Sequence, residues 1–228
     1  MDADPILYEG LVKIIFSTEV VNLYERGSLS SQGAGSMGAV PLNEALGAVG
    51  ELLAAEGETE AIVVVGGATL NLLGLVQRTT GDVDVIARAH ADAGGDLHLE
   101  RPLPFPAVLR RAIDTVARDF GLPENWMNAT VAGQWDVGLP PWLVDDIEWR
   151  QFAGLAVGLV GRRTLVALKL PAAADSGPSS VHVQDLKTLT PTDDEFQDVA
   201  PWVISQDGSP DFERMVWEVV EHVRERRE

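Results

Sequence analysis

Residues 62–87, with the sequence IVVVGGATLNLLGLVQRTTGDVDVIA, decide the fold and hold most of the candidate chemistry of this chain. The stretch opens within residues 61–65, a β-branched run that predicts a short strand covered on both faces. Gly66 and Gly67 end that strand, and the leucine-rich residues 68–76 predict a helix packed against it. The first half of the stretch therefore predicts a strand, a glycine turn and a helix.

A second predicted strand covers residues 82–87, where aspartate and valine alternate. A period of two places the carboxylates of Asp82 and Asp84 on one face of the strand and the valines on the other. Solvated residues at a strand end are the ordinary interpretation of such a pair. Aspartate is nevertheless disfavoured in strands, and two on one face repel each other unless a cation lies between them. Hard oxygen ligands on a rigid strand suit Mg²⁺ with bound phosphate.

The glycine pair also has two interpretations. Taken alone, Gly66 and Gly67 form a tight turn. In the functional interpretation, the absence of Cβ atoms lets a triphosphate approach backbone N–H groups at a helix start. The stretch matches neither the dinucleotide pattern G-x-G-x-x-G nor a P-loop with its lysine. The glycines gain weight only from the aspartates that follow them.

Strands alternate with helices early in the chain and give way to helices late, which predicts an α+β fold. We expect a small mixed sheet with flanking helices and a helical C-terminal part. Thr192 with Glu195 predicts a capping box, while Pro171 argues against a regular helix beyond it. The predicted helices cover residues 41–56, 105–120, 164–174 and 179–189, one that begins after Thr192 and one from Phe212 onward; two strands cover 147–152 and 155–160, and 89–104 is a predicted loop.

Three segments follow from this pattern. Residues 1–36 end in a small, polar stretch typical of a linker and are interpreted as a dispensable extension. Residues 37–160 form the predicted core, and residues 161–228 form the helical part, with Lys169 and Asp185.

Composition limits the partners that we expect. The 35 acidic and 17 basic residues give a formal charge of −18, which repels nucleic-acid backbones, so no bulk nucleic-acid-binding surface is expected. Cysteine is absent, which removes thiolate catalysis and zinc–thiolate sites. No apolar run reaches the length of a membrane span, and the acidic N-terminus does not resemble a secretory signal. We expect a cytoplasmic protein without a membrane partner.

The glycine pair, the leucine-rich helix and the pattern R-x-T-x-D-h-D resemble the signature of the nucleotidyltransferase superfamily in its minimal bacterial form. The likeness is greatest to the AbiEii and MenT type associated with toxin–antitoxin systems. It continues in LVALKLPAAAD at residues 165–175 and in HVQDLKTLTPTDDEF at residues 182–196. The resemblance extends roughly from residue 41 to the C-terminus.

The resemblance implies roles for individual residues. Asp82 and Asp84 match the metal-binding pair, for which Mg²⁺ is expected and Mn²⁺ is an alternative. Gly66 and Gly67 match the turn beside the phosphates. The positions expected to contact the nucleotide also include Arg78, Thr80 and Lys169.

Other implied roles stay open. Asp185 matches a late acidic position, where it would orient Lys169 or assist as a base. A third strand carboxylate, the base in many superfamily members, has only the weak candidate Glu148. Without the family pattern, Lys169 is better interpreted as a lysine that extends its head to water, and His182 as a helix-surface or capping histidine.

The implied activity is Mg²⁺-dependent transfer of a nucleoside monophosphate from an NTP to an acceptor hydroxyl. Expected partners are the NTP, an acceptor RNA or protein, and a cognate antitoxin if the chain is the toxin of a toxin–antitoxin system. The alternative is a degenerate nucleotidyltransferase fold that serves as a binding or partner module, which the lack of a clear third carboxylate favours slightly.

Overall fold

The computed structural model of the protein describes residues 41–75 and 82–225. The predicted extension, residues 1–36, lies outside the described residues, as do Arg78 and Thr80.

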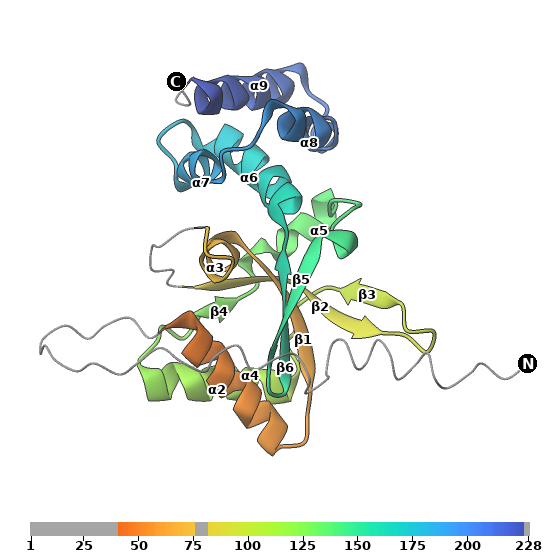
Figure 1. Ribbon diagram of the computed structural model, residues 1–228, viewed down its shortest axis with the longest axis vertical. Coiled ribbons are helices and arrows are strands. Elements are labelled where there is room, and N and C mark those ends of the chain that lie inside the picture. Colours follow the sequence, from red (N-terminus) through yellow and green to blue (C-terminus); the bar gives the residue numbers. More distant parts are fainter. Residues whose placement is uncertain (1–40, 76–81, 226–228) are drawn as a thin grey trace, which may run out of the picture.

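A mixed six-stranded sheet forms the centre of the molecule (Figure 1). Its strand order is β3-β2-β1-β6-β5. The short strand β4 pairs with Val83 and Asp84 at the start of β2, before the residues of β2 that pair with β3. The pairs β1–β6 and β2–β4 are parallel, whereas β1–β2, β2–β3 and β5–β6 are antiparallel. The strands are β1 Glu60–Val65, β2 Val83–Ala91, β3 Leu97–Glu100, β4 Met127–Asn128, β5 Ile147–Phe152 and β6 Leu155–Val160.

Side chains of the central strands are buried on both faces of the sheet. On one face, Ile62 and Val64 of β1 join a buried cluster with α2 Leu42–Ala55 and α4 Ala107–Phe120. Both helices were predicted, and Gly121 ends α4 in the left-handed conformation, with φ of 65°. Burial of this apolar face explains why residues 41–55 and 107–120 show helical spacing.

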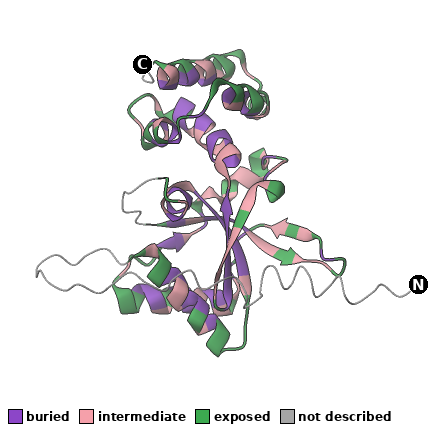
Figure 2. Ribbon diagram, in the orientation of Figure 1, coloured by how far each residue is buried: buried purple, intermediate pink, exposed green. Residues whose placement is uncertain are grey.

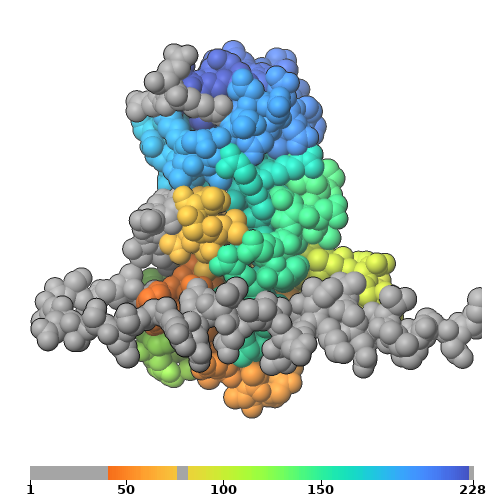
Figure 3. Space-filling view, in the orientation of Figure 1, coloured from red at the N-terminus to blue at the C-terminus, as the bar shows by residue number. Residues whose placement is uncertain are grey.

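The other face of β1 belongs to a second buried cluster, which extends into the helical part of the chain, residues 162–225. Val63 and Val65 share this cluster with Leu165 and Val166 of α6. Figure 2 shows the buried residues continuing from β6 into α6, and Figure 3 shows the helical part forming one end of the molecule. Its helices are α6 Arg162–Ser176, α7 Val181–Leu189, α8 Asp193–Ser205 and α9 Pro210–Arg224. The predicted α+β class, with a mixed sheet and a helical C-terminal part, is confirmed.

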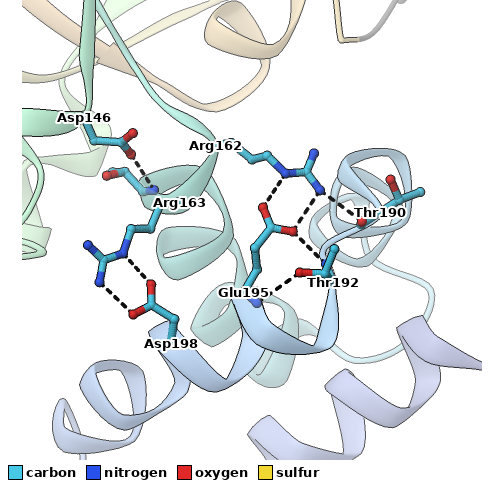
Figure 4. Close-up of polar contacts among 8 residues, drawn as sticks. Asp146, Arg162, Arg163, Thr190, Thr192, Glu195 and Asp198 are labelled. Atoms are coloured by element: carbon cyan, nitrogen blue, oxygen red, sulfur yellow. Dashed lines mark hydrogen bonds and ion pairs between the residues drawn. The ribbon is translucent and has the colours of Figure 1, made fainter.

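A polar network fixes the first turn of α6 to the following helices (Figure 4). The guanidinium of Arg162 donates to both carboxylate oxygens of Glu195 and, at 3.0 Å, to the carbonyl of Thr190. Arg163 forms an ion pair with Asp198 of α8. Bidentate contacts of this kind fix orientation as well as distance. They hold α6 against α8.

Glu195 has a second task at the start of α8. The Thr192 hydroxyl accepts from the Glu195 backbone N–H at 3.2 Å, and the Glu195 carboxylate accepts from the Thr192 N–H at 2.7 Å. This is the predicted capping box. One carboxylate therefore both caps α8 and ties it to α6.

The prediction of a loop over residues 89–104 was wrong. β2 continues to Ala91 and pairs with β3 in an antiparallel hairpin. The Asp92 carboxylate accepts from the N–H groups of Gly94 and Asp96 at 2.8 and 3.0 Å, which closes the turn. The four residues of β3 are too few to show a clear period beside these turn residues.

The interruption expected at Pro171 was also wrong, because α6 continues to Ser176. Proline within a helix costs roughly 3 kcal/mol through a lost hydrogen bond and a clash with the preceding turn. On either side of it, Leu170 and Ala173 are fully buried against the other helices. Tertiary burial outweighs the local preference here.

None of the described helices combines the length and the apolar character that crossing a bilayer would require.

Replacing Glu195 with glutamine should destabilise the protein at neutral pH by about 1–2 kcal/mol, since charged hydrogen bonds are lost. The bond with Arg162 is the main cause that lowers the pKa of Glu195 in the folded protein. A carboxyl group whose pKa is lower in the folded protein stabilises the fold at pH values above its unfolded-state pKa. This stabilisation is lost as the pH falls through its folded-state pKa. The difference between wild type and Glu195→Gln should therefore shrink between about pH 5 and pH 3.

Urea denaturation at several pH values measures this difference. Glu124→Gln, at an exposed position, is the control and should show little change at any pH. A Glu195→Gln effect of equal size at pH 7 and pH 3.5 would contradict the assignment.

Candidate functional site

A cavity of about 280 Å³ lies where the sheet meets the helical part. Its size is near the lower end of the roughly 300–1,000 Å³ that ligand pockets occupy. Residues from the sheet, from the start of α3 Gly66–Leu72, from the segment after β4 and from α6 and α7 form its wall: Val65, Gly66, Asp84, Ile86, Thr130, Val131, Gly133, Gln134, Leu165, Leu168, Lys169, Ala172 and His182. The cavity is the place where several predicted site residues come together.

Asp84 reaches the cavity because of strand alternation. Val83 and Val85 of β2 belong to the cluster beneath α2 and α4, so the side chain between them faces the other way. In register, Asp84 lies between Val65 of β1 and Asn128 of β4. Paired strands on both sides fix its position.

Gly66 lies directly against the Asp84 carboxylate. It is the first residue of α3, Gly66–Leu72, rather than part of a separate turn, and its φ is +74°. A Cβ atom at this position would lie 2.8 Å from Asp84 Oδ2. Both the backbone conformation and the lack of space therefore require glycine here.

Two hydrogen bonds hold α3 in place. The Thr69 hydroxyl donates to the carbonyl of Val64 at 2.8 Å, and the Arg150 guanidinium, from β5, donates to the carbonyl of Leu72 at 2.6 Å. Gly67 is the second residue of α3 and does not line the cavity. Of the glycine pair, only Gly66 touches the candidate site.

The surroundings of the Asp84 carboxylate disfavour its negative charge. Burial raises its pKa above the ordinary value, and the negative charge of Asp82 raises it further. The charge of Lys169 and a hydrogen bond from Asn128 act in the opposite direction. Asp82 itself is exposed and comes just before β2. The predicted pair is thus one half-buried strand residue and one exposed neighbour.

Lys169 lines the cavity from the middle of α6, and its ammonium forms an ion pair of 2.6 Å with Asp185 of α7. The side chains are 12% and 3% exposed, so the pair is largely shielded from water. Breaking such a pair is costly, because it leaves one charge shielded from water without a partner. The Asp185 carboxylate thus lies directly on the lysine head, as the orienting role would require.

His182 also lines the cavity, from the first turn of α7. It is half-buried, and its Nδ1 atom is shielded from solvent without a hydrogen-bond partner in the described part of the chain. Burial is the main cause that lowers its pKa, and the charge of Lys169 lowers it further. His182 is thus a partly exposed helix residue that also borders the cavity, and the sequence does not show that the N-terminal turn of α7 lies beside Lys169.

The remaining wall is the segment after β4, formed by η1 Thr130–Gly133 and α5 Gln134–Val137. Trp135 donates from its indole to the carbonyl of Ile86 at 2.6 Å, and Asn128 accepts from the Thr130 N–H at 2.9 Å. The first bond attaches the segment to β2, and the second attaches it to β4. Sequence reasoning left the path of this stretch open, since prolines and tryptophans obscure any period there.

Glu148 does not belong to the cavity. It lies on β5, directly after η2 Val144–Asp146. Its side chain is 58% exposed and forms an ion pair of 3.0 Å with Arg150. The structure therefore gives no support to Glu148 as the third carboxylate.

A divalent cation is a chemically reasonable occupant beside Asp84. Among the residues that the structure describes, no three His, Asp or Glu side chains form a group suited to a metal. The Asp84 carboxylate, whose pKa is raised by its neighbour Asp82, still fits a hard cation that keeps several waters or shares phosphate oxygens. Asp82 and Asp84 would hold such an ion only with oxygen ligands from water or a substrate.

No protein-family model, curated protein or solved structure matches this chain. The resemblance to nucleotidyltransferases accordingly rests on the sequence motifs alone.

Replacing Gly66 with alanine should destabilise the protein by about 1–2 kcal/mol through left-handed backbone strain and the contact with Asp84. The matched control is Gly47→Ala in α2, where an added Cβ meets nothing within 4 Å. That control should stabilise by about 0.5–1 kcal/mol, as alanine does within a helix. Urea midpoints measure both changes, and shifts of the same sign would contradict the geometry.

Asp185→Ala should destabilise the protein by about 3 kcal/mol, the lower end of the range for a broken buried pair, because water in the cavity can reach Lys169. The double variant Lys169→Met with Asp185→Leu removes both charges and should recover much of this loss. Denaturation of the three proteins tests the pair. A double variant as unstable as Asp185→Ala would show that the contact is not the source of the loss.

Proposed function

We propose that the protein is a metal-dependent nucleotidyltransferase that moves a nucleoside monophosphate from an NTP to an acceptor hydroxyl. The single observation that carries this proposal is the cavity that joins Asp84, Gly66 and Lys169 from three separate elements. A carboxylate for a metal, a side-chain-free approach and a fixed positive charge are the parts that phosphoryl transfer requires.

Bound Mg²⁺, or Mn²⁺, would neutralise charge on the phosphates and polarise the α-phosphorus. Asp82 and Asp84 would be its protein ligands. The absence of a Cβ atom at Gly66 lets the backbone lie directly against the Asp84 carboxylate. The strand pairing on both sides of Asp84 keeps its carboxylate in place without reorganisation during the reaction.

Lys169 would place its ammonium on the same phosphates. The ion pair with Asp185 fixes the direction of that charge in an environment that is largely shielded from water. The acceptor is an RNA or protein hydroxyl, and the chain would act as the toxin-type component of a toxin–antitoxin pair, with the cognate antitoxin as its partner.

The direct test incubates the protein with each α-³²P-labelled NTP, Mg²⁺ and a cell extract, followed by nuclease or protease treatment to identify the labelled acceptor. Asp82→Ala and Asp84→Ala should each lower transfer by about 100-fold or more. Loss of a residue that only hydrogen-bonds to a metal ligand typically costs about 10–100-fold, and loss of the ligand itself should cost more. Asp114→Ala, exposed on α4 on the far face of the sheet, is the control and should transfer normally. Transfer that survives both site substitutions would remove the site assignment.

A second candidate is a degenerate nucleotidyltransferase fold that binds a partner. The observation that favours it is the missing third acidic ligand within the described residues. Thermal unfolding with NTP and Mg²⁺ separates the candidates, because a ligand at 100 times its Kd stabilises by about 2.7 kcal/mol. Mg²⁺-dependent stabilisation by an NTP supports the enzyme, whereas no shift with any NTP supports the binding module.

A further inference from the structure

Transfer to a hydroxyl requires a group that removes the hydroxyl proton, and the cavity offers few. The titratable residues of its described wall are Asp84, Lys169 and His182. Asp84 is assigned to the metal in the proposed function. Lys169 is an ammonium held by Asp185, so it has no free electron pair to accept a proton.

Residues outside the wall are no better placed. Asp185 is 3% exposed and already accepts from Lys169. Glu148 is bound to Arg150 on β5, away from the cavity. His182 is the one described wall residue that can accept a proton and has no other assigned task.

The environment of His182 suits this task. Its Nδ1 atom is out of solvent and makes no hydrogen bond within the described residues, so no described carboxylate holds the ring as a cation through that atom. Burial and the charge of Lys169 lower its pKa, which leaves the ring neutral at pH 7. The charged groups around it are Lys169 on α6, Asp185 on its own helix and Asp84 across the cavity.

We propose that His182 is the general base of the transfer reaction, an inference that rests on the proposed function. The imidazole takes the proton of the acceptor hydroxyl as the oxygen electron pair forms a bond to the α-phosphorus. The bond from the α-phosphorus to the bridging oxygen breaks, and its electrons leave with pyrophosphate. The proton on His182 then passes to solvent.

Asp185 supports the protonated state of His182. The two residues are three positions apart on α7 and so share one helix face. The negative charge of Asp185 raises the proton affinity of the ring, in opposition to Lys169. One carboxylate therefore positions the lysine that contacts phosphate and moderates the basicity of the histidine.

The test uses single-turnover transfer by the full chain with Mg²⁺ and the labelled NTP. His182→Ala should slow transfer by about 100-fold or more, within the 10²–10⁴ range of general base catalysis. Adding imidazole should restore part of the lost rate, because a free base can enter the space left by the ring. His98→Ala, with an exposed ring on the β2–β3 hairpin, is the control and should neither slow nor respond to imidazole.

Mg²⁺-dependent NTP stabilisation of both variants is measured in parallel. A purely structural role for His182 predicts lost binding or lost folding, with no imidazole effect. His182→Gln, which keeps a polar side chain of similar size, covers the case in which the alanine variant does not fold: as a base mutant it should be slow but should bind NTP normally.

The outcomes separate the two proposals. Normal transfer by His182→Ala or by His182→Gln overturns the assignment of the base and leaves the proposed function standing, as does a slow His182→Ala that binds NTP but ignores imidazole. Absence of transfer by the wild-type protein with every NTP removes both proposals. Slow transfer with imidazole rescue and intact NTP binding supports both.

Discussion

The alternation of side chains between the two faces of β2 is the constraint on which the candidate site depends. Val83 and Val85 are fully buried beneath α2 and α4, and moving the strand by one residue would turn both to the opposite face of the sheet. The carboxylate of Asp84 is therefore directed to the opposite face by the hydrophobic core, not by any polar contact of its own. The cost is a desolvated charge beside Asp82, and the core must offset it.

The second half of the site comes from the helical part, and it depends on the packing of α6. Leu165, Leu170 and Ala173 are buried among the helices, while Lys169 lies on the side of α6 that faces the cavity. The ion pair with Asp185 joins α6 to α7, and the contacts of Arg162 and Arg163 join α6 to α8. Any motion that separated the helical part from the sheet would separate Lys169 from Asp84. The cavity is thus as rigid as this packing.

Much of the fold was predictable because its signals are local. The β-branched run of β1, the spacing of α4 and the capping box of Thr192 and Glu195 each depend on a few consecutive residues. Pro171 misled for the same reason, since its local penalty is outweighed by burial against residues far along the chain. A local pattern reports what the backbone prefers and not what the core imposes.

The site was predictable only where the motif itself is local. Asp84 and Gly66 lie 18 positions apart on adjacent strand and helix, and the resemblance already paired them. The place of His182 depends on how α7 crosses α6, which no spacing in the sequence specifies. Gly67 illustrates the converse, because the motif treats the two glycines alike and only the backbone of Gly66 needs glycine.

Charge balance links the metal and the nucleotide in the proposed enzyme. Asp82, Asp84 and Asp185 outnumber Lys169 around the cavity, and the whole chain carries a formal charge of −18. A free triphosphate would enter a field that repels it. A divalent cation held by Asp82 and Asp84 would cancel this local negative charge, so each ligand would increase the affinity for the other by the same factor. In the proposed enzyme, the negative charge around the cavity would therefore make nucleotide binding conditional on the metal, and Lys169 would direct the phosphates once both are present.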